Sequence, residues 1–438
     1  FMLVLEIALF RFRDNNGSFN ITIGGFFLLV LAIPAVIGAI YLATHADGYL
    51  YYGGRDFNLQ ERLLTQGRVL VFYLQMIVMP SIQALGLYHD DIPISHGLLD
   101  PPATLYSLLA LAGMLLAALV LLGKRPLVSL GILWFFAGHV LESSVIPLEI
   151  AHEHRNYLAD YGILLALGST IAEASTLHRA RTLLNTAVPA MFLVMFAYTT
   201  WLRSEQWSDN INHATYEALH HPQSIRSVFA AGRIHARLAL EGRAESEPRA
   251  FELLERARNL DKTGIMSDVT YIKLSFLIGR PVSPEMYESI INKLANYPLS
   301  TSDISSLKAL AECAGASCDI PEETMDAIFR EAMHTEYPEV LTIYGFYRIN
   351  KRNDFIGGLA LFERALELDP RENQRWKNLI NLLTVMQRFE DAERKLEQFR
   401  LADTHQNSAS DYRVLKQDID SVKDEYNSLK HSGATGSS

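Results

Sequence analysis

The chain has 438 residues, 49% of them hydrophobic and 20% charged, and its formal net charge is −10. An acidic chain without a basic stripe is a poor candidate for binding nucleic acid. The sequence also lacks a Walker loop, a dinucleotide-binding glycine fingerprint, a nucleophile elbow and an HExxH motif, which argues against soluble nucleotide chemistry.

The apolar residues are concentrated before about residue 201. A membrane-spanning helix needs roughly 20 predominantly apolar residues to cross about 30 Å of hydrocarbon. Five runs approach this length, namely 23–43, 105–122, 127–148, 157–175 and 185–201. We therefore predict an all-α protein that begins with a polytopic transmembrane helix bundle over residues 1–201.

The first ten residues, FMLVLEIALF, are apolar from Phe1 and have neither the basic start nor the cleavage site of a signal peptide. We expect this segment to be the end of a membrane span. The natural protein is then expected to extend further toward its N-terminus.

Positive charges in short loops mark the cytoplasmic side of a membrane protein. We take six residues as inside markers, namely Arg11, Arg13, Lys124, Arg125, Arg179 and Arg181. This places the loop with Asp90, Asp91 and Asp100, and everything after Trp201, on the outer face. Segment 58–88 contains Gln75 and Pro80 and is predicted to be a re-entrant or interfacial helix, with a plain crossing as the alternative.

Residues 202–430 alternate helical periods with short polar breaks and are predicted to form a TPR-like α-solenoid, followed by a disordered tail at 431–438. Large and small packing residues recur at the spacing of a roughly 34-residue helix-turn-helix repeat. Those of the last two units are Phe362, Ala365, Pro370, Trp376, Leu379 and Ala392. Stacked repeats leave a concave groove suited to a protein or peptide, although a solenoid without a ligand is the alternative.

Cys313 and Cys318 are the two cysteines of the chain. Two cysteines alone do not complete a structural zinc site. In an oxidising compartment such a closely spaced pair can form a small disulfide loop, so we regard the two residues as a disulfide candidate.

The segment 142–157, ESSVIPLEIAHEHRNY, carries unusual charge at the outer end of a predicted span. Arg155, with His154 or His152, could bind the phosphate of an amphiphilic donor. Glu149 and Glu153 could orient these cations or bind a metal ion. The alternative is an ion-pair cluster that only fixes the loop.

A second polar group lies near the predicted re-entrant segment. Asp90 and Asp91 could hold a divalent cation or act as a general base, although adjacent acidic residues in a loop are usually only solvated. Arg62, at the start of the same segment, could again meet a lipid phosphate.

The order of these parts resembles a known family. It runs RLLTQGRVLVFYLQMIVMP, LYHDD, a span, KRPLVSLGILWFFAGHVLESSVIPLEIAHEHRNYL, two spans, WLRSEQW and then TPR units. This resembles the GT-C class of membrane glycosyltransferases with a C-terminal TPR domain, including the transmembrane-and-TPR O-mannosyltransferases and their bacterial relatives. The E-R-x-x-Y pattern of that family maps onto Glu153, His154 and Tyr157, so histidine stands here in place of the arginine.

The resemblance implies transfer of a sugar from a polyprenyl-phosphate-linked donor to protein hydroxyl groups outside the membrane, with the TPR domain engaging the acceptor. It implies a multi-pass protein of the bacterial inner membrane with the TPR domain in the periplasm. No redox cofactor is implied, and a divalent metal ion stays open. The catalytic carboxylates of the class are expected upstream of Phe1, so this chain alone is expected to be inactive.

Two other functions stay open on the same residues. One is a non-catalytic, membrane-anchored TPR scaffold for envelope assembly. The other is a polysaccharide ligase or polymerase that acts on glycans.

Overall fold

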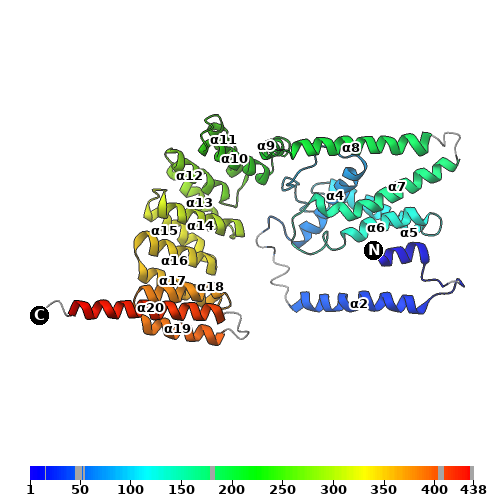
Figure 1. Ribbon diagram of the computed structural model, residues 1–438. Coiled ribbons are helices and arrows are strands. Elements are labelled where there is room, and N and C mark those ends of the chain that lie inside the picture. The colour runs from blue at the N-terminus through cyan, green and yellow to red at the C-terminus, as the bar shows by residue number, and fades with distance from the viewer. Residues whose placement is uncertain (15, 45–51, 53–54, 178–182, 403–408, 435–438) are drawn as a thin grey trace. The chain divides into compact units, whose positions relative to one another are not determined.

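A computed structural model describes all residues except 15, 45–51, 53–54, 178–182, 403–408 and 435–438 (Figure 1). The described residues form helices and turns without a strand, and one isolated bridge joins Arg13 to Phe19. The predicted all-α class is confirmed. The chain divides into two compact units, Phe1–Leu260 and Asp261–Ser438. This division by contacts falls later than the change in composition after Trp201.

Two helices of the first unit are long and apolar enough to cross a membrane. They are α2 (Ile21–Thr44), which has no buried residue, and α5 (Ala103–Leu121). A short helix α1 (Met2–Leu5) and a π-helical turn (Glu6–Phe10) precede them. Within the described residues these two are the candidate spans, so the larger polytopic bundle stays a prediction. Of the inside markers, Arg179 and Arg181 lie outside the described residues.

The predicted re-entrant segment begins with one unbroken helix, α4 (Leu59–Val78). Asn58 and Glu61 form a capping box at its start, in which each side chain accepts a hydrogen bond from the backbone amide of the other residue. One face of α4 buries polar side chains, including Arg62 and Gln66. The helix ends before Pro80, and an irregular loop follows it.

The expected continuous span at 127–148 is wrong. Helix α6 (Pro126–His139) ends well before Leu148, and the backbone up to Ala151 is irregular. Carbonyl groups released from a helix need other donors. Side chains supply them here, because Arg62, Tyr52, Arg55 and Gln66 donate to carbonyl oxygens between residues 142 and 150.

Helix α7 (Tyr157–Leu177) packs closely along α6. A Cβ atom on Gly131 of α6 would clash with the carbonyl oxygen of Gly162 of α7, and the reverse also holds. Small residues allow such close approach of helix backbones. The contact therefore depends on glycine at both positions.

The first unit ends with helices that lead out of the apolar region: α8 (Val188–Gln206), α9 (Asn210–His220), α10 (Ile225–Leu240) and α11 (Ser246–Leu260). Side chains cap two of them, because Asp209 accepts from the amide of Asn212 and Ser224 accepts from the amide of Ser227. Amphipathic α10 and α11 bury their apolar faces against each other.

The second unit is a succession of amphipathic helices around two apolar cores. Its helices are α12 (Met266–Ile278), α13 (Pro284–Asn296), α14 (Thr301–Ala316), α15 (Glu322–Ala332), α16 (Pro338–Arg352), α17 (Phe355–Leu368), α18 (Asn373–Val385), α19 (Phe389–Ala402) and α20 (Ala409–Ala434). Cys313 and Cys318 are joined by a disulfide in the first core. Helix α20 continues into the predicted disordered tail as far as Ala434, and residues 435–438 lie outside the described part.

The repeat-like packing residues lie in the second core. Trp376, Leu379 and Ala392 are buried there together with Phe362, and Ala365 is buried on α17. The carbonyl oxygen of Pro370 accepts a hydrogen bond from Nε1 of Trp376 at 2.9 Å. The indole therefore buries its ring and satisfies its only polar group at the turn before its own helix.

We expect Gly162→Ala to destabilise the first unit by about 1–3 kcal/mol, because the added methyl group overpacks the α6–α7 contact. Melting of the purified chain in detergent, followed by tryptophan fluorescence, measures the effect. Gly168→Ala on the same helix is the matched control, since a Cβ there meets no atom within 4 Å. Equal melting of the two variants would contradict the role given to the close approach.

A buried ion pair gives a second prediction, for the second unit. Lys293 Nζ lies 2.7 Å from Oδ2 of Asp268, whose side chain is fully buried. Asp268→Asn leaves the ammonium group without its counter-charge and should lower the free energy of unfolding by about 3–5 kcal/mol. Chemical denaturation followed by circular dichroism measures this change. Lys308→Ala, which removes an exposed pair with Glu312, is the control and should cost about 0–1 kcal/mol.

Candidate functional site

Arg62 connects α4 to the irregular segment after α6. Its guanidinium group donates to the carbonyl oxygens of Glu142 (2.7 Å), Ser144 (3.0 Å) and Leu148 (2.5 Å). The side chain has no exposed surface. Arg62 is therefore not available to a lipid phosphate, and this part of the predicted donor site is corrected to a structural role.

Arg155 is also largely occupied by its own segment. Nη1 donates to the carbonyl oxygen of Glu149 at 2.8 Å, Nη2 lies 3.4 Å from Oε2 of Glu149, and Nε lies 3.7 Å from Oε2 of Glu142. These contacts are those of the ion-pair cluster that the sequence left as the alternative. Arg155 adds positive charge to the neighbourhood while its main contacts hold the loop together.

His152 and His154 lie side by side, with ring centroids 4.1 Å apart, just before α7. His154 is exposed and His152 is half-buried. The amide of His152 donates to the hydroxyl oxygen of Tyr73 at 2.7 Å, which fixes the backbone at this point. Burial, and then the charges of His154 and Arg155, lower the pKa of His152. Of the four predicted phosphate ligands, these two imidazoles keep their accessibility.

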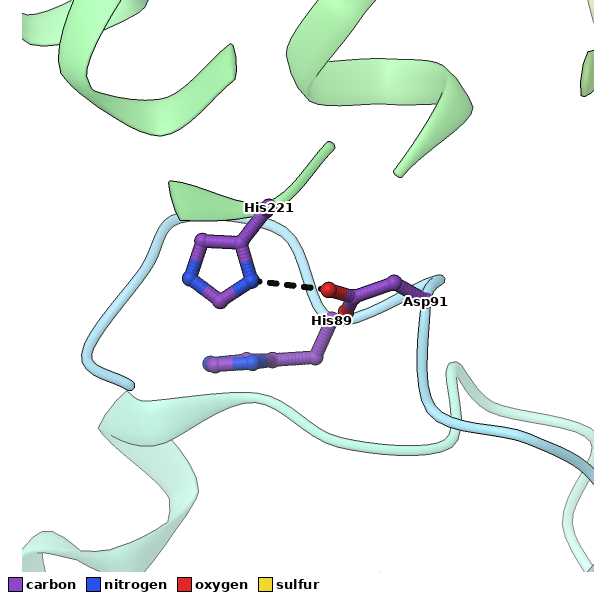
Figure 2. A group of neighbouring side chains, drawn as sticks. All are labelled: His89, Asp91 and His221. Carbon is purple, nitrogen blue, oxygen red and sulfur yellow. Dashed lines mark hydrogen bonds and ion pairs between the residues drawn. The ribbon is translucent and has the colours of Figure 1, made fainter. Parts of the chain in front are cut away.

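Three residues from distant parts of the chain could hold a metal ion. One potential ligand atom from each of His89, Asp91 and His221 lies within 4.8 Å of the others (Figure 2). Oδ2 of Asp91 is 2.9 Å from Nδ1 of His221. His221 follows α9, whereas His89 and Asp91 belong to the loop after α4.

The hydrogen bond between Asp91 and His221 determines the direction of both of their pKa shifts. The hydrogen bond with Asp91 outweighs burial and raises the pKa of His221. Burial alone would raise the pKa of Asp91, but the hydrogen bond and charge of His221 lower it. Each side chain therefore favours the charged form of its partner.

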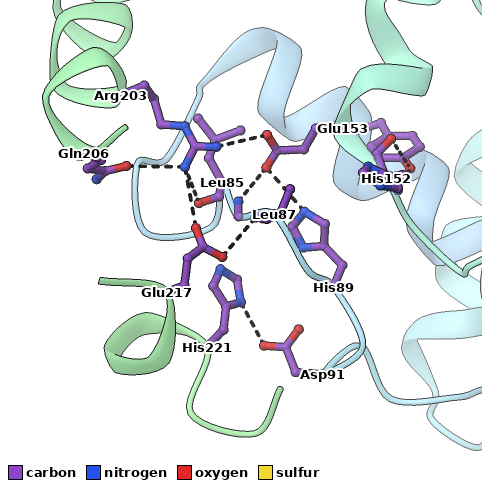
Figure 3. Close-up of polar contacts among 12 residues, drawn as sticks. Leu85, Leu87, His89, Asp91, His152, Glu153, Arg203, Gln206, Glu217 and His221 are labelled. Atoms are coloured by element: carbon purple, nitrogen blue, oxygen red, sulfur yellow. Dashed lines mark hydrogen bonds and ion pairs between the residues drawn. The ribbon is translucent and has the colours of Figure 1, made fainter. Parts of the chain in front are cut away.

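Two further carboxylates clamp the backbone of the same loop (Figure 3). Oε1 of Glu153 accepts from the amide of Gly86 at 2.6 Å and lies 3.3 Å from Nε2 of His89. Oε2 of Glu217 accepts from the amide of Leu87 at 2.9 Å. Arg203 lies between these carboxylates, 3.5 Å from Glu153 and 3.9 Å from Glu217, and donates to the carbonyl oxygen of Leu85 at 3.0 Å.

Gly86 lies where the loop after α4 comes close to His221 and Glu217. A Cβ atom at this position would lie 2.7 Å from Nε2 of His221 and 3.0 Å from Oε2 of Glu217. A side chain at this position would force His221 to shift and would press on Glu217. Glycine therefore allows the loop to lie against both residues without moving them.

Asp90 binds the start of α10. Its carboxylate accepts from Oγ of Ser224 at 2.5 Å and from the amide of Arg226 at 3.1 Å. The side chain of Arg226 in turn lies 3.1 Å from Glu149. Burial alone would raise the pKa of Glu149, but Arg226, Arg55 and Arg155 lower it.

The position of Asp90 at the start of α10 is favourable, because an acidic group there meets amide groups that have no partner within the helix.

The four acidic residues singled out in the sequence therefore share one feature. Each of Glu149, Glu153, Asp90 and Asp91 contacts the stretch from Arg203 to Arg226. Sequence reasoning missed their partners, namely Arg203, Glu217, His221, Ser224 and Arg226. Arg203 lies in the quoted segment WLRSEQW, and the adjacent histidines at 220–221 are a further local signal, but nothing in the sequence connects either of them to LYHDD.

A half-open cavity of about 430 Å³ borders this network. Leu87 and Tyr88 of the loop form one wall, and side chains of α9 and α10, including His213 and Arg237, form the others. The ring of His213 packs at a tilt against Trp207, with ring centroids 4.3 Å apart, and its ring nitrogens are buried without a hydrogen-bond partner. Such a mixed polar and apolar hollow can accommodate a small ligand or a side chain.

Comparisons with protein-family models, with curated proteins and with solved structures found no match to this chain.

The structural role of Arg62 gives a testable prediction. Arg62→Lys replaces the planar guanidinium group, whose three nitrogens each donate to one carbonyl oxygen, with a single ammonium nitrogen. We expect at least one of the three buried carbonyl groups to lose its donor, and each unsatisfied group costs about 1–3 kcal/mol. We expect a clear drop in the melting temperature of the detergent-purified chain. Arg125→Lys is the control, because Arg125 is about half exposed and pairs at the surface with Glu173. An Arg62→Lys variant that melts with the wild type would contradict this assignment.

Proposed function

We propose that this chain is part of a membrane glycosyltransferase that transfers a sugar from a polyprenyl-phosphate-linked donor to protein hydroxyl groups at the outer face of a membrane. The resemblance in segment order and the two long apolar helices support this proposal. The observation that carries it is the accessible imidazole pair, His152 and His154, beside Arg155 at the entry to α7.

The chemistry of a lipid-linked donor agrees with this position. Its phosphate is anionic, and the start of α7, which the 3-10 turn Glu153–Asn156 extends, is the positive end of a helix dipole. Protonated or neutral imidazoles add hydrogen-bond donors that can follow a phosphate. Helix α7 carries no charged residue between Asp160 and Glu173, so a lipid chain could run along this stretch while the phosphate stays at the start of the helix.

The acceptor side of the proposal rests on the second unit. Its consecutive amphipathic helices, with the packing residues of TPR-like units in its core, are the kind of array that binds peptides on a concave face. We propose a multi-pass protein of the bacterial inner membrane whose helical repeat lies in the periplasm. The disulfide between Cys313 and Cys318 supports an oxidising compartment.

A membrane-anchored scaffold is the second candidate, and a specific observation favours it. Arg62, Arg155 and the four acidic candidates all make contacts that hold the loops and helix ends together. A protein that only positions a helical repeat at a membrane needs such a junction and no donor site.

Binding of a polyprenyl phosphate to the detergent-purified chain, measured by native mass spectrometry, separates the two. We expect the double variant His152→Ala/His154→Ala to bind at least about tenfold more weakly, since hydrogen bonds to a charged group contribute about 1.5–3 kcal/mol. His334→Ala, which removes an exposed histidine of the second unit, should bind like the wild type. Equal binding by all three proteins, or binding by none, would favour the scaffold.

A further inference from the structure

We propose that His89, Asp91 and His221 bind a divalent transition-metal ion of the zinc class, which fastens the loop after α4 to the junction of α9 and α10. The proposal does not depend on the transferase function. It concerns a ligand set that joins residues 130 positions apart in the chain.

The donor atoms select the kind of ion. Two imidazole nitrogens and one carboxylate oxygen are ligands that suit zinc and its neighbours, whereas magnesium and calcium prefer sets of oxygen atoms. Three protein ligands leave one position of a tetrahedral ion for water or another small ligand. The set thus has the composition of an open zinc site.

The geometry is close to what such an ion needs. Two ligands about 2.0–2.1 Å from a tetrahedral zinc ion lie roughly 3.3 Å apart. Oδ2 of Asp91 and Nδ1 of His221 are 2.9 Å apart in a hydrogen bond, and the three ligand atoms lie within 4.8 Å of one another. Small side-chain rotations would therefore exchange the proton for a metal ion without a change of the backbone.

Burial makes the group unlike a chance cluster of surface residues. His89 and His221 are each only 6% exposed, and Asp91 between them is half-buried. The potential ligand atoms therefore lie inside the protein and not among solvated side chains of the surface.

The charge around the group also favours a cation. Asp91, Glu153 and Glu217 surround the two histidines, and Arg203 is the guanidinium group that contacts two of these carboxylates (Figure 3). Glu217 is almost fully buried. Even when His221 is protonated, these three carboxylates outnumber the two positive groups, Arg203 and His221, so negative charge remains in a region of limited hydration that a divalent ion would offset.

Glu153 supplies the contact expected outside the ligand set. A metal-bound histidine usually donates its second ring nitrogen to a carboxylate, which fixes the orientation of the ring. Nε2 of His89 lies 3.3 Å from Oε1 of Glu153. Because Glu153 is itself held by the amide of Gly86 and by Arg203, it would keep His89 in place for the metal.

The consequence of metal binding lies in the loop. Leu87 and Tyr88, which form one wall of the 430 Å³ cavity, are next to His89 in sequence. A metal ion at His89 and Asp91 would fix this wall against α9 and α10. Metal occupancy would then set the shape of the cavity.

The test measures metal content and melting of the full chain in detergent. The protein is stripped with a chelator, dialysed against zinc, freed of excess metal and analysed by mass spectrometry for zinc. We expect one zinc ion per chain, and a higher melting temperature that the chelator reverses. His221→Asn should bind zinc at least about tenfold more weakly, because even the loss of a contact outside the ligand set costs roughly 10–100-fold.

His221→Asn is chosen because its side-chain amide can still donate to Asp91, so the chelator-treated variant should melt near the wild type. Asp91→Asn tests a second ligand. His220→Ala is the matched control, since its ring stacks on the neighbouring Tyr216 and lies outside the ligand set. A wild-type chain without zinc, equal zinc in His221→Asn and Asp91→Asn, or a loss of zinc in His220→Ala would each overturn the proposal.

Discussion

The buried guanidinium group of Arg62 joins α4 to the irregular segment after α6, and the candidate sites of the first unit depend on this connection. Arg62 lies on α4, and its three hydrogen bonds satisfy carbonyl groups of the irregular segment that follows the end of α6 at His139. Irregular backbone in an apolar environment is stable only when its polar groups find partners inside the protein. Without this donor the segment after His139 would have to continue as a helix or reach water. The positions of Glu149, Glu153 and the two accessible histidines all follow from where Arg62 holds the segment.

Acidic side chains of that segment and of the loop after α4 contact residues that are distant in the chain. Glu153 and Glu149 reach Arg203 and Arg226, while Asp90 and Asp91 reach Ser224 and His221. Each contact ties an irregular loop to the end of a helix, where free backbone groups and charged side chains can be matched. The junction between the apolar helices and α9–α10 is therefore electrostatic, and its strength depends on how well buried charges are paired.

This arrangement separates two kinds of polar residue that look alike in the sequence. Arg62, Arg155 and the four acidic candidates contact other parts of the protein and hold them together. In contrast, His152 and His154 keep accessible imidazoles just before α7. The proposed donor site and the proposed metal-stabilised junction can coexist, because the donor site uses His152 and His154 whereas the junction uses His89, Asp91 and His221. The junction would hold the loop, and the imidazole pair would meet the lipid phosphate.

The sequence by itself determined the all-α class and the approximate positions of most of the apolar helices, because the length and periodicity of an apolar run are local properties. It could also single out LYHDD and the segment 142–157 as unusual, because charge density is a local property. Only the tertiary structure decided that α6 stops at His139, since the donor that permits this lies 80 positions from Glu142. It alone paired Asp91 with His221, because side chains so distant in the chain meet only after the helices have packed.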